Sequence, residues 1–495
     1  MRRLHRDQRG QSLPAILALI TVLFLLGSAL AAHVSVAIQA TVANESQAGD
    51  LDAADAGAEL GMWWQRNWKA GNRPSINVNG LTVNTTVGTS GAVPCPTPSP
   101  VKVTGFEHGA VSATGGGLFS AVNGTGMTAD SVVWRTGNYS LKDTDPVGTA
   151  SDASLAIGAG MAVVRVYLRL ASLPAADVNE LLILDAAAGS DLRIDYQASS
   201  AKLTLRFANT AVTIASSTVS PSTWYRLDVR LGASTNPRTA DWQIDGVAQT
   251  ALSSTEAAST VSTLRLGSTV VADTFTANYD DVLISATSAD YPIGAGTVVA
   301  LRPNGMGTNS IPGSFRNDDG TAIDPNTYLR LDDSPMTGLT DYVRQQIIGA
   351  AAYIEVTFAD TAATCVVGVS ALAAYHAAAN PADNGKTSVI DGGTERVVFN
   401  GDMSGTTLQY VSLIVAPASA PWTPTAVNGL LGRIGFSTDV TPNPYWDALL
   451  LEVATGTSVA GTVTVSSTAG SSTITTTYTD VGASSPTLLT WSTTR

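Results

Sequence analysis

The pattern of hydrophobic and polar residues changes character after the first seventy positions of the chain. Residues 13–32 carry no charge, and twenty apolar positions are about the length of a helix that crosses a lipid hydrocarbon core. Beyond Trp68, apolar residues mostly alternate with polar ones, which is the period of strands with one buried face. The pattern therefore predicts a mainly β chain, in which a long N-terminal transmembrane helix precedes two β-sandwich domains.

Beyond residue 32, apolar residues continue to recur without proline as far as Trp68. We therefore expect residues 11–70 to form one transmembrane and amphipathic helix. Residues 1–10 form a basic leader, with four arginines and one aspartate. This positive charge predicts a single span of the cytoplasmic membrane, with a cytoplasmic N-terminus and an extracellular remainder. The span residues that define it are Leu13, Pro14, Ile16, Leu19, Leu23, Leu26 and Leu30.

Two other interpretations of this segment stay open. The first is a cleaved secretory signal, for which Ala29-Leu30-Ala31 would be the cleavage site. The second is a plain signal anchor. The length of the apolar run and its continuation beyond His33 favour a helix that is retained.

The same segment resembles the N-terminus of minor type IV pilins of the PilX kind and related pseudopilins. The residues that carry the resemblance are the junction at Gly10 and Gln11 and the acidic, alanine-rich series 52–59. The resemblance implies that a prepilin peptidase cuts after Gly10, that Gln11 is the first mature residue, and that the helix packs with other pilin or pseudopilin subunits. Major pilins have glutamate at the fifth mature residue, where this chain has Ala15, which favours a minor or tip subunit.

Residues 71–100 predict a hairpin followed by a linker. Asn79-Gly80 separates two short apolar-rich stretches, and Asn-Gly is the preferred two-residue turn of a β-hairpin. The series from Pro94 to Pro100 alternates proline with small polar residues, which predicts a stiff, extended joint.

Residues 101–293 predict the first sandwich, because short alternating strands recur between turn signals. The clearest are 163–169, 192–196, 203–207, 224–230 and 241–246. With Gly105-Phe106-Glu107, 135–141, the Asp245-Gly246 turn and 279–284, the region resembles the concanavalin-like, or laminin-G-like, jelly roll. That resemblance implies adhesion or binding of a glycan or another surface.

No residue is predicted to be catalytic. The glutamates Glu107, Glu180 and Glu256 are far apart in the sequence, whereas retaining glycosidases need two carboxylates about 5 Å apart. The chain is therefore predicted not to be an enzyme. Trp134, Trp224 and Trp242 occur in strand-like contexts, so we expect them in the core rather than on a sugar-binding surface.

The sequence contains few candidates for a metal site or a disulfide. Asp280 and Asp281 form a candidate calcium site, since hard cations prefer oxygen ligands, but acids on an outer face or in turns are the favoured alternative. No other cofactor is expected, because two cysteines and four scattered histidines make no transition-metal site of usual spacing. Cys95 and Cys365 are a candidate disulfide.

Residues 296–455 predict a second sandwich, with strands at 328–333, 352–358, 408–415 and 448–453. Through 332–335, 340–343 and Pro421-Trp422-Thr423 it resembles a module of phage virion proteins, which implies a display unit without chemistry. Residues 456–495 form a β segment with almost no charge that completes the second sandwich, forms an appendage, or pairs with a neighbouring subunit. Completion within the chain is the favoured alternative.

The length and net charge of the chain reduce the number of functions that it could have. A length of 495 residues predicts about three domains, and a net charge of −13 argues against a nucleic-acid partner. We therefore expect a minor or tip subunit of a type IV pilus or pseudopilus, with sandwiches that serve adhesion or glycan binding. The alternatives are a virion or tail-fibre structural protein and, less favoured, an exported carbohydrate-active enzyme.

Overall fold

A computed structural model describes residues 54–56, 76–78, 81–90 and 98–494, the last stretch with gaps. The gaps are at 114–117, 147, 158–159, 161, 187–190, 209–212, 233–236, 256–259, 334, 337–338, 340, 347–350, 378–384, 404–406, 419, 437–443, 457–461, 470–471 and 480–486. The predicted leader, the span, and the processing site at Gly10 and Gln11 lie outside the described residues. Among the helices of the described part, none is long and apolar enough to cross a membrane. The chain forms two compact units, one from residues 1–94 with 458–495 and the other from residues 95–457.

The first unit contains one antiparallel sheet with the strand order β1-β2-β30-β31-β32. Strands β1 (Ile76–Val78) and β2 (Leu81–Ser90) pair across Asn79-Gly80, with Val78 opposite Leu81. Strand β2 then pairs with β30 (Thr462–Ala469), which continues into β31 (Ser472–Thr479) and β32 (Thr487–Thr494). The C-terminal strands thus extend the hairpin near the N-terminus, and they do not complete the second sandwich.

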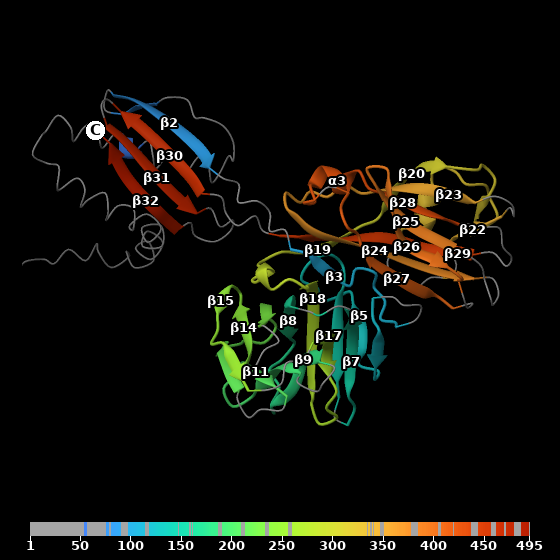
Figure 1. Cartoon of the computed structure of the whole chain (residues 1–495), viewed down its shortest axis with the longest axis horizontal. Helices are drawn as coiled ribbons and strands as arrows, with labels where there is room; N and C mark the ends of the chain where they lie inside the picture. The colour runs from blue at the N-terminus through green and yellow to red at the C-terminus, as the bar shows by residue number, and fades with distance from the viewer. Residues whose placement is uncertain are drawn as a thin grey trace, which may run out of the picture. The chain divides into compact units, whose positions relative to one another are not determined.

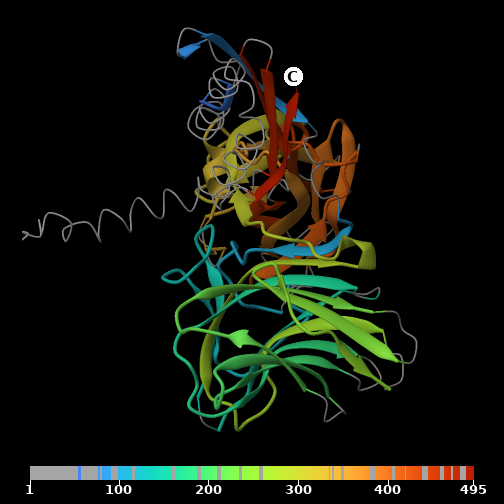
Figure 2. The same cartoon turned by 90° about the vertical axis from the view of Figure 1, so that its left-hand side faces the viewer.

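The first sandwich consists of two antiparallel sheets, visible as two layers of green strands (Figure 1, Figure 2). One sheet has the order β12-β11-β10-β9-β17-β7-β4, and the other β15-β14-β13-β8-β18-β6-β5, with β16 on β14 and β3 on β18. The bounds are β3 Pro100–Thr104, β4 Ala121–Asn123, β5 Met127–Asp130, β6 Ser140–Asp145, β7 Ser151–Ala156, β8 Val163–Leu170, β9 Val178–Ala186, β10 Leu192–Gln197, β11 Lys202–Phe207, β12 Thr213–Thr218, β13 Trp224–Leu231, β14 Arg238–Ile244, β15 Val247–Ala248, β16 Leu252–Ser254, β17 Val261–Ser268 and β18 Phe275–Ser285.

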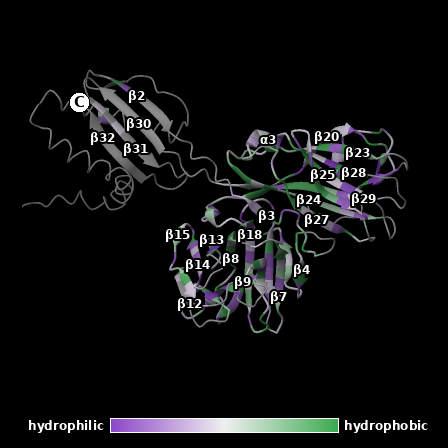
Figure 3. Cartoon of the chain, viewed as in Figure 1, coloured by the Kyte–Doolittle hydropathy of each residue, from purple (hydrophilic) through white to green (hydrophobic). Residues whose placement is uncertain are grey.

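Strand β14 shows how alternation supplies the core of this sandwich. On β14, Ala240, Trp242 and Ile244 are buried between the sheets, while the residues between them are half-buried on the other face. Alternation places every second side chain on the same face, so one face of each strand supplies the core. Figure 3 shows polar and apolar residues interspersed along the strands of both sandwiches. The mainly β prediction with sandwich domains is confirmed for this part of the chain.

The second sandwich is built from a sheet ordered β21-β22-β29-β24-β27, with β19 on β29, and a sheet ordered β20-β23-β28-β25-β26. The bounds are β19 Val298–Leu301, β20 Pro303–Asn309, β21 Phe315–Asn317, β22 Val343–Gln345, β23 Ala352–Phe358, β24 Val366–Ala377, β25 Gly385–Asp391, β26 Thr394–Gly401, β27 Gln409–Ile414, β28 Leu431–Phe436 and β29 Pro444–Thr455. Two 3₁₀ turns, η2 (Ser288–Asp290) and η3 (Thr327–Arg330), and the short helix α3 (Pro424–Asn428) complete the unit.

Two local predictions in this region have different outcomes. The strand predicted at 328–333 is wrong, because the main-chain N–H of Leu331 donates to the Tyr328 carbonyl and closes the 3₁₀ turn η3. At the turn predicted at Pro421-Trp422-Thr423, the chain bends at Pro421 and then enters α3, which Thr423 caps by accepting a hydrogen bond of 3.1 Å from the Ala426 N–H.

Strand β24 is buried along its whole length, which is unusual for a strand of a two-layer sandwich. One face contributes Val369 and Ala371 to the core. The other face contacts Met336, which packs with Leu372 and Ala374 and covers the outside of the sheet. This double burial explains why the sequence of β24 is apolar almost throughout.

The two sandwiches belong to one compact unit and share an apolar cluster. Val103 and Leu283 of the first sandwich pack there with Val298, Val367 and Ala454 of the second. Beside this cluster, the buried Glu452 of β29 accepts hydrogen bonds from the Thr104 hydroxyl (3.2 Å) and from the main-chain N–H groups of Gly105 (3.2 Å) and Glu107 (2.9 Å). Polar and apolar contacts together hold the sandwiches as one body.

Candidate functional site

The candidate calcium residues Asp280 and Asp281 lie on β18, where the register with β8 shifts and Asp281 has a φ of 51°. Asp280 accepts a hydrogen bond of 2.8 Å from the Arg135 N–H, and Asp281 accepts one of 2.6 Å from the Thr136 hydroxyl. Asp281 also accepts from the Val298 N–H and pairs with the Arg135 guanidinium. Burial and the neighbouring Asp281 raise the pKa of Asp280 well above its usual value.

These contacts give both carboxylates a structural role. Their oxygens hold the loop at 135–136 and the start of the second sandwich at Val298 against the middle of β18. Throughout the described residues, no group of three or more His, Cys, Asp or Glu is arranged to hold a metal ion. Both aspartates are completely buried within β18, so they lie neither on an outer face nor in a turn, and the hydrogen bonds that they accept give them a structural role.

Of the two cysteines that were predicted to form a disulfide, the structure describes Cys365. Cys365 is buried beside β24 and is disulfide-bonded. Cys95 lies outside the described residues, so the pairing of the two cysteines stays a prediction.

Of the three tryptophans predicted to be in the core, Trp242 is 1% exposed and donates to the Thr250 carbonyl at 3.0 Å, so that prediction is confirmed. Trp224 is half-buried. For Trp134 the prediction is wrong, because its side chain is 42% exposed. It lies on the loop between β5 and β6 rather than in a strand, and Asp130 fixes that loop by accepting from the Val132 N–H at 2.8 Å.

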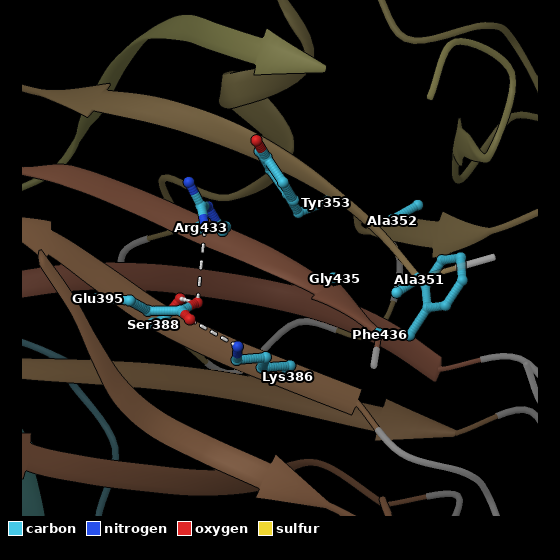
Figure 4. Close-up of a pocket in the computed structure, with 9 residues that line it drawn as sticks. All are labelled: Ala351, Ala352, Tyr353, Lys386, Ser388, Glu395, Arg433, Gly435 and Phe436. Atoms are coloured by element: carbon cyan, nitrogen blue, oxygen red, sulfur yellow. Dashed lines mark hydrogen bonds and ion pairs between the residues drawn. The ribbon is translucent and has the colours of Figure 1, made fainter. Parts of the chain in front are cut away.

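A groove lies on the outer face of the sheet β20-β23-β28-β25-β26 in the second sandwich (Figure 4). Its volume is about 270 Å³. The lining residues come from four neighbouring strands or their ends: Ala351, Ala352, Tyr353, Lys386, Ser388, Glu395, Arg433, Gly435 and Phe436. We call this set the Tyr353 groove.

Strand alternation decides which side chains reach the groove. On β28, Ile434 belongs to the core, so Arg433 and Gly435 face outward. On β23, Ile354 belongs to the core, so Tyr353 and Glu355 face outward beside them. The register of β23 with β28 places Tyr353 directly opposite Gly435. Strand β23, the hairpin β25-β26 and strand β28 thus contribute to one surface, although they are separate in sequence.

Opposite charges are balanced and fixed within the groove. Glu395 accepts hydrogen bonds of 2.7 Å from the Lys386 ammonium and 2.7 Å from the Ser388 hydroxyl. The Arg433 guanidinium lies 2.6 Å from a Glu355 oxygen and 3.7 Å from a Glu395 oxygen. Burial alone would raise the pKa of Glu395, but the hydrogen bonds from Lys386 and Ser388 outweigh it and hold the pKa below its usual value.

Tyr353 supplies a tyrosine ring to the lining of the Tyr353 groove. The Arg433 guanidinium lies 3.8 Å from the centre of the Tyr353 ring, a cation–π contact that fixes both side chains. Gly435 keeps the space beside the ring open, since a Cβ there would lie 2.9 Å from the Tyr353 Cβ and 2.3 Å from the Ala352 carbonyl oxygen. A half-buried ring next to fixed donors and acceptors suits a ligand that is flat on one face and rich in hydroxyl groups.

Sequence reasoning missed the Tyr353 groove and predicted a second sandwich without chemistry. The alternation within Ala352–Phe358 does mark Tyr353 and Glu355 as outward-facing. The pairing that brings them beside Lys386, Glu395 and Arg433 depends on contacts between strands, which a single sequence pattern does not contain.

Comparisons with known proteins give a likeness of fold. No family model matches the chain, and no curated protein matches it. Among solved structures, the cellulose induced protein Cip1 is 16% identical with a TM-score of 0.32, and the match covers 38% of this chain and 97% of Cip1. The alginate lyase Aly36B is 12% identical with a TM-score of 0.27, covering 37% of this chain and 95% of the lyase.

A sialidase of Trypanosoma rangeli in complex with the inhibitor DANA is 11% identical with a TM-score of 0.26, and the match covers 37% of this chain and 32% of the sialidase. The chain is thus distantly similar in structure to jelly-roll sandwiches of carbohydrate-active proteins. At these identities and scores the likeness concerns the fold and carries no argument about function.

Proposed function

We propose that this chain is a surface-displayed binding protein whose second sandwich holds a neutral oligosaccharide in the Tyr353 groove. The observation that carries the proposal is the preassembled set of ring, donors and acceptors on an open sheet face. The two basic side chains, Lys386 and Arg433, are each paired with a glutamate. Because these charges cancel, the groove favours a neutral ligand over an acidic one.

The groove favours binding over hydrolysis. A glycosidase needs one carboxylic acid that stays protonated near neutral pH, and its pKa must therefore be raised. In the groove the pKa of Glu395 is instead lowered, and Glu355 is held by Arg433. We therefore propose a protein without enzymatic activity.

The N-terminal segment supplies the attachment in this proposal. Residues 11–70 would serve as the retained helix of a minor or tip pilin-like subunit, anchored in the cytoplasmic membrane and packed with other subunits. Mass spectrometry of the native protein tests this part. A mature chain that begins at Gln11 supports it, whereas a chain that begins near His33 excludes both the anchor and the filament role.

The binding proposal is tested on an array of neutral, uronic-acid and sialylated oligosaccharides, followed by calorimetry with the neutral oligosaccharide that gives the strongest signal. Tyr353→Ala and Arg433→Ala are each expected to weaken that binding by at least about tenfold, the size of a stacking or charged hydrogen-bond contribution. Arg433→Lys provides a second variant that keeps the charge but loses the planar stacking on Tyr353.

Arg230→Ala is the matched control, because Arg230 also pairs with an aspartate, Asp241, and stacks on a tyrosine, Tyr291, at 4.7 Å. It lies in the first sandwich, away from the Tyr353 groove. Unchanged binding in Arg230→Ala and loss in the groove variants support the proposal. Binding restricted to acidic sugars, or equal losses in all variants, would count against it.

A further inference from the structure

Two aspartates of β6 face the interior of the first sandwich. Asp143 and Asp145 alternate with Leu141, which belongs to the core, so all three side chains point between the two sheets. Asp143 is 0% exposed and Asp145 is 1% exposed. Among the described residues, their four carboxylate oxygens have no hydrogen-bond partner of normal geometry, although the Ser151 and Thr149 hydroxyls lie close enough to Asp143 and Asp145, respectively, to act against the rise in their pKa values.

A serine from the opposite sheet faces the same space. Ser151 begins β7 and alternates with the core residues Ala153 and Leu155, which directs its side chain inward as well. It is 1% exposed, and within the described part of the chain its hydroxyl has no hydrogen-bond partner of normal geometry. The hydroxyl nevertheless lies close enough to Asp143 to influence its ionisation.

Two glycines allow close packing at this place. At Gly267, where φ is +102°, a Cβ would lie 2.4 Å from the Met127 methyl carbon, 2.4 Å from the Ser151 carbonyl oxygen and 2.7 Å from an Asp143 carboxylate oxygen. At Gly126, a Cβ would lie 2.3 Å from the Thr144 carbonyl oxygen and 2.7 Å from the Ser151 hydroxyl. Oxygen atoms of Asp143 and Ser151 therefore approach Gly267 together, beside the Met127 methyl group.

Negative charges act on both aspartates. Burial is the first cause that raises their pKa values, and Asp145 and Asp152 raise that of Asp143 further, to about 8, while Asp273 raises that of Asp145 further, to about 6. Asp273 is itself satisfied by the Ser268 hydroxyl (2.7 Å) and the Asn179 N–H (3.0 Å). Among the described residues, no lysine or arginine forms an ion pair with Asp143 or Asp145.

Buried carboxylates without partners are costly, and folded proteins neutralise them with protons or cations. We propose that Asp143, Asp145 and Ser151 bind one calcium ion between the two sheets. The available ligands are all oxygen atoms, which suits a hard cation, and two carboxylates balance its double charge. Calcium is favoured over magnesium because it accepts an irregular oxygen set and does not need to retain several waters.

The site is separate from Asp280 and Asp281, and it has two carboxylates rather than three. Its position suggests what the ion does for the fold. Strand β6 belongs to one sheet and β7 to the other, so a bound ion joins the sheets at the point where the chain crosses between them. The ion would stabilise the first sandwich without touching the Tyr353 groove.

The test uses the full chain after treatment with chelator and then addition of 1 mM calcium chloride. The melting temperature is expected to rise by about 5 °C, and elemental analysis after dialysis to give one calcium per chain. Terbium is a second probe, because the buried ring of Tyr279, whose pKa burial and the nearby Asp143 raise, lies close enough to sensitise its luminescence.

The variant Asp143→Asn/Asp145→Asn is expected to lose the calcium-induced rise and the terbium signal, while its calcium-free melting temperature at pH 8 is not lowered, since two buried charges are gone. Ser151→Ala is a milder variant, expected to weaken calcium binding about tenfold or more. The matched control is Asp185→Asn/Asp241→Asn, two partly exposed aspartates of the same sandwich that pair with arginines.

Loss of the calcium effect in the Asp143/Asp145 variant together with its retention in the control supports the proposal. The proposal is overturned if the wild-type chain binds no calcium and gives no terbium luminescence, or if the Asp143/Asp145 variant keeps the full calcium effect. An equal stabilisation by magnesium at the same concentration overturns the assignment to calcium.

Discussion

The carboxylate of Glu452, on the last strand of the second sandwich, accepts a 2.9 Å hydrogen bond from the main-chain N–H of Glu107, at the start of the first sandwich. Glu107 in turn accepts a 2.9 Å hydrogen bond from the Asn138 N–H. Both glutamate side chains are completely buried. Two acids more than 300 positions apart thus tie the sandwiches to each other and to the loop that carries Trp134.

Removal of the Glu452 carboxylate is expected to destabilise the chain. Glu452→Ala leaves the donors on Thr104, Gly105 and Glu107 without their acceptor, and buried donors of this kind cost roughly 1–3 kcal/mol each when unpaired. We expect a total loss of about 3 kcal/mol in urea unfolding. Glu452→Gln retains an acceptor oxygen and is expected to lose less than half as much; equal losses would contradict the role of the hydrogen bonds.

Stability is expected to fall as the pH rises from 5 to 8.5 in the presence of chelator. Burial is the first cause that raises the pKa of four carboxyls, to about 8 in Glu107 and Asp143 and to about 7 in Asp195 and Glu452. The folded chain holds these protons more tightly than the unfolded chain, whose carboxyls titrate near pH 4. Their contribution is therefore complete below pH 4 and is lost as the pH rises through the folded pKa values.

The measurement is the melting temperature across this pH range at constant ionic strength, with an expected decrease on the order of 5 °C. Glu452→Gln should flatten the part of the curve near pH 7. A melting temperature that is constant or increases over the range would contradict the expected sign.

Gly137 is expected to tolerate no side chain. Its φ is +72°, and a Cβ would lie 1.8 Å from a Glu107 carboxylate oxygen. Gly294 is the matched control, since its φ is +82° but a Cβ there would meet no described atom within 4 Å. Gly294→Ala should cost about 1 kcal/mol from backbone strain alone, and Gly137→Ala at least about 2 kcal/mol more. Equal effects in thermal unfolding would show that the contact with Glu107 is unimportant.

The disulfide at Cys365 is expected to link to Cys95. Peptide mapping without reductant should give one peptide that contains both cysteines and that separates on reduction. Because such a bond would close a long loop, its reduction or Cys365→Ser should destabilise the chain by about 4 kcal/mol. An unlinked Cys95 peptide in the oxidised protein would contradict the pairing.

The local alternation of polar and apolar residues was sufficient to predict several strands of the two sandwiches. Alternation in 163–169, 241–246 and 352–358 predicts strands with one buried face, and strands β8, β14 and β23 lie there in the structure. Of these, β14 has one buried face, whereas β8 is buried on both faces. This works because a strand's two faces follow directly from neighbouring positions in the sequence. The prediction from local pattern was wrong for Trp134, which is exposed. Its sequence is strand-like, but Asp130 holds this segment in a loop by accepting a hydrogen bond from the Val132 N–H, so the segment does not join a sheet.

The sequence by itself determined that the chain is mainly β and where several strands of the sandwiches lie, because these properties depend on residues close together in the chain. Only the tertiary structure decided that Tyr353, Lys386, Glu395 and Arg433 share one groove and that the C-terminal strands extend the hairpin at residues 76–90. It alone also placed Asp143 of β6 beside Ser151 of β7, between two sheets. Each of these depends on which strands pair and in what register, and contacts between distant strands determine both.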